Sequence, residues 1–264
     1  MSDAWEEFDC ELARWREIGR PVEFWWRDDD ASRPDPALDQ LLQLASESGI
    51  PLALAVIPDS AQPAAFKNLR AGIAVLQHGV DHSNRAEAGE KKTEFPSSQP
   101  VEDALTKLAG GRAKLEALFG ANRVLPVLVP PWNRIAPALV SHLAGAGYRG
   151  LSTFGRKKVT NFPAGVTLVN THVDIIDWKG GRKFWGSERV LNDVARLLAE
   201  RRTGASSASE PVGWLTHHAV HDAQAWQFLD RLFRTSREAQ GVVWRSAESL
   251  FEAEPLHRAR LPGQ

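Results

Sequence analysis

The sequence predicts an α/β barrel of seven or eight strand-helix units. Apolar runs typical of buried strands alternate with amphipathic stretches along the whole chain, which indicates a parallel sheet. The chain has 264 residues, a length that fits this number of units in one large domain. Polar clusters follow several of the apolar runs, as expected where barrel strands end at a functional face. Because no repeat or linker divides the chain, we expect a single domain over residues 1–264.

In the first half of the chain the alternation is regular. Apolar residues recur every three or four positions over 3–18 and predict a helix, which Gly19 and Pro21 end. By the same reasoning, further helices are predicted over 36–48, 61–69 and 101–119, and strands over 22–26, 51–57, 73–77 and 124–129. The polar segment 83–100 is expected to be a loop, either over the site or simply a solvated surface.

The second half continues the pattern with shorter strands. Helices are predicted over 136–146, 190–201 and 223–238, and extended segments over 150–154, 166–169, 172–176, 212–216 and 241–245. Residues 203–209 are rich in Ser and Ala and predict a surface loop. The residues after 245 are expected to form a loosely held tail.

Composition excludes several classes of partner. The net charge is -1, so no basic surface recruits nucleic acid or an anionic membrane. Cys10 is the only cysteine, which excludes an intramolecular disulfide and fits a reducing compartment. The acidic, polar N-terminus does not resemble a signal peptide, and no segment reaches transmembrane length. We therefore expect a cytoplasmic protein.

Two polar clusters have the residue types of a metal site. His78 and His82 directly follow one predicted strand, and the run from Asp28 to Asp30 follows another. Three adjacent carboxylates repel one another at the end of a strand, so they favour a bound cation. Two imidazoles and one carboxylate would leave coordination positions open for water and substrate, as in a catalytic site. The same ligands occur in non-haem iron oxygenases, which remain an alternative.

Five short motifs follow the predicted strands in order. They are Asp-Asp-Ala at 29–31, His-x-x-x-His at 78–82, Pro-Pro-Trp-Asn at 130–133, Val-Asp-x-x-Asp-Trp at 173–178 and Leu-x-His at 215–217. In type and order they resemble the polysaccharide deacetylases, the carbohydrate esterase group that shares the NodB homology domain. The resemblance covers residues 22–250.

This resemblance implies a distorted (β/α)7-8 barrel with one divalent metal. In the family the metal is commonly Zn²⁺, and Co²⁺, Mn²⁺, Ni²⁺ or Fe²⁺ are alternatives. The matching motif positions make Asp30, His78 and His82 the expected ligands. The implied partner is a carbohydrate or another small molecule.

The resemblance also implies the roles of the catalytic residues. Asp29 would be the general base, His217 the general acid, and Asp177 the residue that orients His217. Trp178 would form a wall of the acyl pocket, and the backbone N–H of Trp132 would help to hold the oxyanion. The expected substrate-binding residues are Pro131, Trp132, Asn133 and Trp178.

The chain departs from the family in its third motif. Val129 stands where the family has an arginine that contacts the base, so either Arg27 or Arg134 is expected to substitute for it, or activity is altered. Asn133 replaces a glycine of the same motif. Two assignments stay open: the aspartate pair could be 28/29 instead of 29/30, and the acid could be His218.

The implied function is a metal-dependent hydrolase that removes an acetyl group from an N-acetylated sugar or a related small substrate. Removal of an O-acetyl group is a less favoured alternative. The family includes relatives that act on cyclic amides, so a hydrolase of non-sugar C–N bonds is an alternative. Loss of the third-motif arginine leaves a further alternative, a catalytically inactive relative that only binds carbohydrate.

Overall fold

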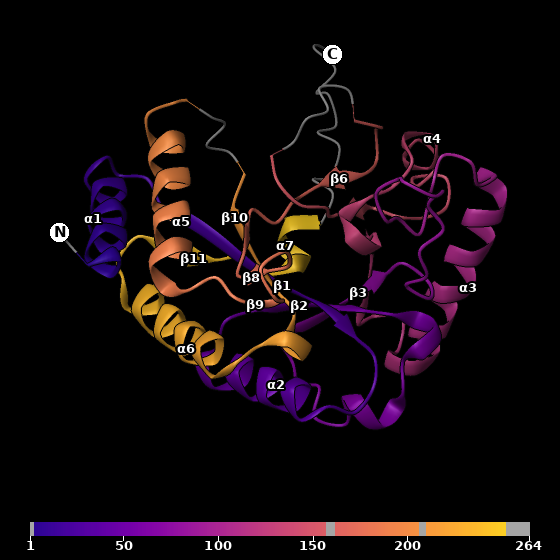
Figure 1. Ribbon diagram of the computed structural model, residues 1–264, viewed down its shortest axis with the longest axis horizontal. Coiled ribbons are helices and arrows are strands. Elements are labelled where there is room, and N and C mark those ends of the chain that lie inside the picture. The colour runs from indigo at the N-terminus through magenta and orange to yellow at the C-terminus, as the bar shows by residue number, and fades with distance from the viewer. Residues whose placement is uncertain (1–2, 157–161, 206–209, 252–264) are drawn as a thin grey trace, which may run out of the picture.

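The computed structural model describes residues 3–156, 162–205 and 210–251, in which helices form an arc around a curled parallel sheet (Figure 1). In hydrogen-bonded order the strands are β6 (Thr167–Leu168), β5 (Gly150–Leu151), β4 (Val124–Val129), β3 (Ile73–His78), β2 (Leu52–Val56), β1 (Val22–Ala31), β10 (Val212–Thr216) and β7 (Val173–Asp174). A ninth strand, β11 (Val242–Trp244), pairs with the beginning of β1. The predicted distorted barrel is confirmed.

The segment from β6 to β7 brings the two ends of the sheet together. Its first half pairs with β5, and the N–H of Val169 donates to the carbonyl of Leu151. Its second half lies against β10, where the N–H of His172 donates to the carbonyl of Gly213. A single stretch of chain therefore spans the gap between β5 and β10, so the barrel closes without two long neighbouring strands.

The helices are α1 (Ala4–Glu17), α2 (Pro36–Ser48), α3 (Val101–Phe119), α4 (Pro137–Val140), α5 (Ser187–Arg202), α6 (Ala223–Glu238) and α7 (Ala247–Phe251). Local sequence signals explain where several of them begin. Asp3 and Glu6 form a capping box at the start of α1, and Asp35 and Asp222 accept backbone N–H groups at the starts of α2 and α6. Gly49 ends α2 in the left-handed conformation that glycine favours.

Side chains of β1 alternate between two cores. Phe24 and Trp26 belong to the large apolar cluster beneath the outer helices. Trp25 points the other way, into a smaller interior cluster that contains many alanines, and its indole N–H donates to the carbonyl of Asn170. Phe251 of α7 packs on Trp25 edge to face. These groups fill the barrel, so the polar residues at its carboxyl end stand on a packed base.

Two predicted helices are wrong in length. The segment predicted as a helix over 61–69 contains only a short 3-10 turn, η2 (Pro63–Phe66), and a second 3-10 turn, η1 (Pro58–Ser60), precedes it. Each turn begins at its proline, a position where the missing N–H has no intrahelical partner to lose. The helix predicted over 136–146 ends at Val140 and continues as turns. Part of the predicted loop 203–209 and most of the predicted tail lie outside the described residues.

The predicted segment 172–176 is divided. It forms β7 and a separate strand, β8 (Ile176–Asp177), which pairs antiparallel with β9 (Lys183–Phe184). β1 is longer than predicted and continues through the aspartates to Ala31. Among the described helices, none combines the length and apolar character needed to cross a membrane.

Candidate active site

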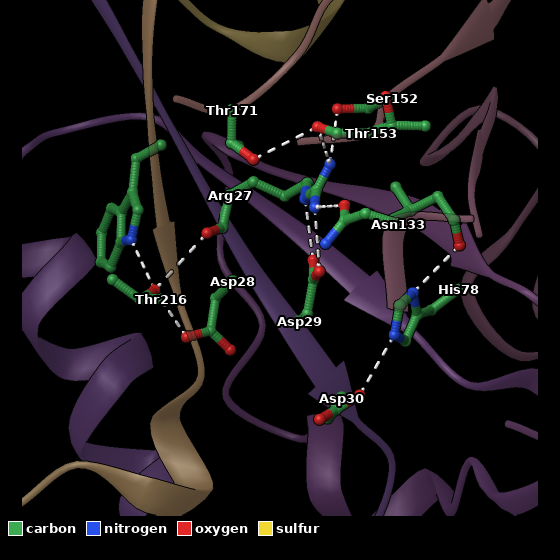
Figure 2. Close-up of polar contacts among 12 residues, drawn as sticks. Arg27, Asp28, Asp29, Asp30, His78, Asn133, Ser152, Thr153, Thr171 and Thr216 are labelled. Atoms are coloured by element: carbon green, nitrogen blue, oxygen red, sulfur yellow. Dashed lines mark hydrogen bonds and ion pairs between the residues drawn. The ribbon is translucent and has the colours of Figure 1, made fainter. Parts of the chain in front are cut away.

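The end of β1 distributes its polar side chains to two faces. Successive side chains of a strand point to opposite sides, so Arg27 and Asp29 share the barrel interior while Asp28 points outward. Figure 2 shows Asp28 beside Thr216 and Asp29 beside the guanidinium of Arg27. Asp30 stands at the end of the strand and faces His78. The three adjacent aspartates therefore have three different surroundings.

Asp30, His78 and His82 form a cluster that fits a divalent metal. Oδ1 of Asp30 lies 3.1 Å from Nε2 of His78 and 3.2 Å from Nε2 of His82. One potential ligand atom from each residue lies within 4.8 Å of the other two. Nδ1 of His78 lies 3.0 Å from the carbonyl of Val129, an arrangement that orients Nε2 toward the cluster. Nitrogen and carboxylate ligands of this kind suit zinc and related cations.

The pKa values of Asp30 and His78 both indicate a site that favours positive charge. Burial opposes ionisation of Asp30, but hydrogen bonds from His78 and His82 hold the pKa of this carboxyl well below its usual range. Burial also disfavours a charged His78, yet the carboxylates of Asp29 and Asp30 raise its pKa. The site therefore attracts positive charge, which a bound cation would supply.

The backbone of the site is held in a conformation that side chains other than glycine seldom adopt. Asp30, His82, Trp132 and Asn133 have positive φ angles of 75°, 56°, 55° and 56°. Each such residue costs of order 1 kcal/mol or more, so the surrounding contacts must hold these conformations. Arg182 is the one other non-glycine residue with positive φ in the described part of the chain. Strain is thus concentrated at the candidate site.

Arg27 holds Asp29 in a buried ion pair. Its Nε donates to Oδ1 of Asp29 at 2.8 Å and its Nη2 to Oδ2 at 3.0 Å. Nη1 donates to the hydroxyl of Ser152 at 2.6 Å, and Nη2 also donates to Oδ1 of Asn133 at 2.8 Å (Figure 2). Arg134 instead donates to the carbonyl of Lys92. Arg27, and not Arg134, therefore contacts Asp29 as the family's third-motif arginine was expected to do.

Asp28 and His218 are paired with each other outside the barrel interior. Oδ1 of Asp28 lies 2.5 Å from Nδ1 of His218, and Oδ2 accepts from the hydroxyl of Thr216 at 2.7 Å. Burial opposes ionisation, but His218 lowers the pKa of Asp28. Both side chains are buried. This pair leaves Asp29, Asp30 and His217 to face the site.

His217 lies beside Trp178 at the end of β10. The ring centroids are 4.6 Å apart and the rings meet edge to face. Nδ1 of His217 is buried and has no hydrogen-bond partner among the described residues. Two exposed aromatic side chains, Trp178 and Phe154, line a cavity of about 560 Å³ that also reaches Asp174. Trp178 lines this cavity and also contacts His217, but His217 and the cluster of Asp30, His78 and His82 are not among the described residues that line it.

The two aspartates of the fourth motif have different surroundings. Oδ1 of Asp177 accepts from the N–H groups of Lys179 and Gly180, so this carboxylate stabilises a turn rather than contacting His217 as we expected. Asp174 is the half-buried acid nearby, and it accepts from the indole of Trp178 at 2.7 Å. Burial raises the pKa of Asp174, and His217 lowers it. Sequence reasoning overlooked Asp174, although both aspartates belong to the same motif.

The turn after β4 forms the opposite wall, at η3 (Pro131–Asn133). The ring of Trp132 lies 4.4 Å from that of His82, and Asn133 contacts Arg27. Pro131 is buried against Gly79, where an added Cβ would lie 2.6 Å from Cδ of the proline. The predicted residues of the third motif therefore meet the histidine motif and the Arg27–Asp29 pair.

Comparison with known proteins gives a fold match and no sequence match. No family model matches the chain, and no curated protein matches it. A protein assigned as a polysaccharide deacetylase from Mycobacterium smegmatis superimposes with a TM-score of 0.65 at 14% identity, covering 86% of this chain and 88% of that one. A peptidoglycan deacetylase from Bacillus subtilis matches with a TM-score of 0.54 at 16% identity, covering 88% and 90%.

A third similar structure was solved with a metal ion bound. A family 4 acetyl xylan esterase from Clostridium thermocellum, solved with a cobalt ion, matches with a TM-score of 0.53 at 13% identity, covering 87% of this chain and 90% of that one. The chain thus has the fold of the polysaccharide deacetylases. The resemblance drawn from its motifs is confirmed at the level of the fold.

Proposed function

We propose that this protein is a metal-dependent hydrolase that removes an acetyl group from an N-acetylated sugar or a related small substrate. The observation that carries the proposal is the grouping of Asp30, His78 and His82 beside a buried, arginine-bound carboxylate, Asp29. On this fold, the solved structures of similar shape are described as deacetylases and acetyl esterases.

The metal would be held by Asp30, His78 and His82. A divalent cation there, with zinc as the first candidate, would act as a Lewis acid toward the acyl carbonyl and make a water molecule easier to deprotonate. Three protein ligands leave room for water and substrate. The carboxylate of Asp30 and the two imidazoles supply these three ligands.

Asp29 is the proposed general base. Both of its oxygens accept hydrogen bonds from Arg27, so the carboxylate is fixed in orientation and cannot rotate toward other donors. Its neighbour on the strand, Asp30, faces the cation site, so the base would lie next to the water that it deprotonates. Arg27 takes the position-holding role that the family gives to its third-motif arginine.

His217 is the proposed general acid. It directly follows β10 and lies beside Trp178, where it could deliver a proton to the leaving amine. We assign the role of the carboxylate that accompanies His217 to Asp174 rather than to Asp177, because the charge interaction with His217 lowers the pKa of Asp174. Trp178 and Trp132 would bound the acyl group on two sides, and the N–H of Trp132 would help to hold the oxyanion.

Two substitutions test this proposal. Asp29→Asn should keep the metal and lower the rate of acetate release by at least about 100-fold, since general-base catalysis contributes roughly that much. His82→Ala should lose the metal itself. Metal content by elemental analysis and acetate release from N-acetylated sugars, with zinc, cobalt or manganese added, separate the two effects.

Asp39→Asn is a matched control because Asp39 is exposed on α2. Full activity of Asp29→Asn would show that the aspartate register is wrong. A bound metal with no acetate release from any sugar would favour cyclic amides or other C–N bonds as substrates. Wild-type protein that binds carbohydrate, contains no metal and releases no acetate would instead indicate a catalytically inactive relative.

A further inference from the structure

The polar segment after the histidine motif is tied to both walls of the site. The hydroxyl of Thr93 donates to the carbonyl of Arg134, and the N–H of Ala136 donates to the carbonyl of Phe95. Arg134 also donates from its side chain to the carbonyl of Lys92. Residues 92–95 are therefore fixed against the chain that leaves η3, and are more than a solvated surface loop.

Glu94 lies in the middle of this contact and reaches the histidine motif. It is 1% exposed, and its Oε1 accepts from the N–H of Val80 at 2.9 Å and of Asp81 at 3.2 Å. These two N–H groups lie between the proposed ligands His78 and His82. A single carboxylate oxygen therefore holds the short turn that sets the positions of both imidazoles.

The second oxygen of Glu94 packs directly on the turn. Oε2 is buried and has no hydrogen-bond partner among the described residues. It lies 2.1 Å from the position that a Cβ of Gly79 would take, so the contact requires glycine there. Nη1 of Arg85 lies 3.6 Å from Oε1 and compensates part of the charge, while the same guanidinium pairs with Asp81 at 2.6 Å. Burial raises the pKa of Glu94.

We propose that Glu94 is a positioning residue for the metal site: its hydrogen bonds to Val80 and Asp81 hold the turn on which His82 has a positive φ angle. This inference rests on the metal site of the proposed function. The reason is that a strained conformation persists only where its surroundings fix it, and Glu94 supplies a buried acceptor for two adjacent donors. Without the acceptor, the turn can relax and His82 can leave the cluster.

Cobalt titration of the full chain tests the role of Glu94. Glu94→Ala should weaken Co²⁺ binding by about 10-fold to 100-fold, the usual effect of losing a residue that orients a metal ligand, and should alter the visible absorption of the bound cobalt. Glu94→Gln keeps an acceptor oxygen, so it should retain the wild-type spectrum and an affinity within about threefold. Glu90→Ala is the matched control, because Glu90 is exposed on the same segment.

Glu94→Asp gives a second test if the alanine variant does not fold, because aspartate keeps the charge but is too short to reach both donors. It should weaken cobalt binding while the glutamine variant does not. The inference is overturned if folded alanine and aspartate variants bind cobalt as wild type does, or if the glutamine variant loses as much affinity as they do. Wild-type protein that binds no cobalt would overturn the metal site itself, and the inference with it.

Discussion

At the scale of single residues, β1 shows how a strand gives neighbouring identical side chains different roles. Asp28, Asp29 and Asp30 carry the same group, but the two-residue period of a strand turns Asp28 outward to His218 and Asp29 inward to Arg27. Asp30 then leaves the regular strand, with φ of 75°. The geometry therefore favours 29/30 as the base and ligand pair over 28/29.

Arg27 should be essential for both the stability and the activity of the site. Arg27→Met leaves Asp29 buried without its cation, and breaking a buried ion pair in this way typically costs about 3–5 kcal/mol of unfolding free energy. The double variant Arg27→Met/Asp29→Asn removes the uncompensated charge and should recover part of the loss. Urea unfolding in the presence of a chelator measures both effects without metal.

Arg134→Met is the comparison for this prediction, since Arg134 contacts Lys92 rather than Asp29. It should keep the wild-type free energy of unfolding in the chelator experiment, because its contact with Lys92 is exposed and separate from the Arg27–Asp29 ion pair. An Arg27→Met protein as stable and as active as wild type would mean that the arginine has no part in holding the base.

At the scale of elements, the turn between β10 and α6 sends three histidines in different directions. His217 faces Trp178 and the site, and His218, in η4 (His218–Val220), pairs with Asp28. The ring of His221 packs against Trp226, and neither of its nitrogens has a hydrogen-bond partner among the described residues. This local turn therefore separates one histidine available for chemistry from two that support the barrel.

His221 should make the fold sensitive to acid. Burial lowers its pKa to about 4, and the nearby His218 and His217 add to the effect while Asp28 opposes it. The unfolded chain has the higher histidine pKa of about 6.5 and binds the proton first, so stability is full above about pH 6.5 and is lost as pH falls toward 4. Between pH 7 and pH 5 the loss from this group is about 2 kcal/mol.

Urea unfolding of wild type and of His221→Phe at both pH values isolates this contribution. The variant should lose less stability between pH 7 and pH 5, whereas His142→Phe, at an exposed position, should behave as wild type does. Identical pH dependence in wild type and His221→Phe would exclude this role for His221.

At the scale of the whole molecule, the candidate metal site joins separate parts of the sheet. Asp30 is the last residue but one of β1 and His78 ends β3, and β2 lies between these strands. A cation would therefore link strands that are not hydrogen-bonded to each other. Its binding free energy would add to the stability of the entire sheet, because the ligands are brought together only in the folded chain.

Metal should accordingly raise the melting temperature of the whole protein. Zinc at 100 times its dissociation constant adds about 2.7 kcal/mol by mass action, which corresponds to a rise of roughly 5–10 °C for a chain of this size. Thermal unfolding with zinc and with chelator measures the difference. His82→Ala should show almost none of it; a similar rise in that variant would place the bound zinc elsewhere.

The sequence by itself determined the barrel and most of the candidate residues. The continuous apolar run of β2 and the amphipathic period of α6 are local sequence signals, so the bounds of both elements were predicted closely. The polar residues after the strands were also predicted to meet, because parallel strands place their carboxyl ends on one face. Short strands such as β8 and the proline-rich turns were poorly predicted, since they depend on pairing partners distant in sequence.

Only the tertiary structure decided which of several similar residues does what. Arg27 and Arg134, Asp174 and Asp177, and His217 and His218 are alike in sequence, and contacts across the barrel distinguish them. The hydrogen bond from the N–H of Val80 to Glu94 is another such contact. It joins residues 14 positions apart in sequence, and no local pattern indicates it. Periodicity fixes the face to which a side chain points, whereas the partner it meets there depends on how distant segments pack.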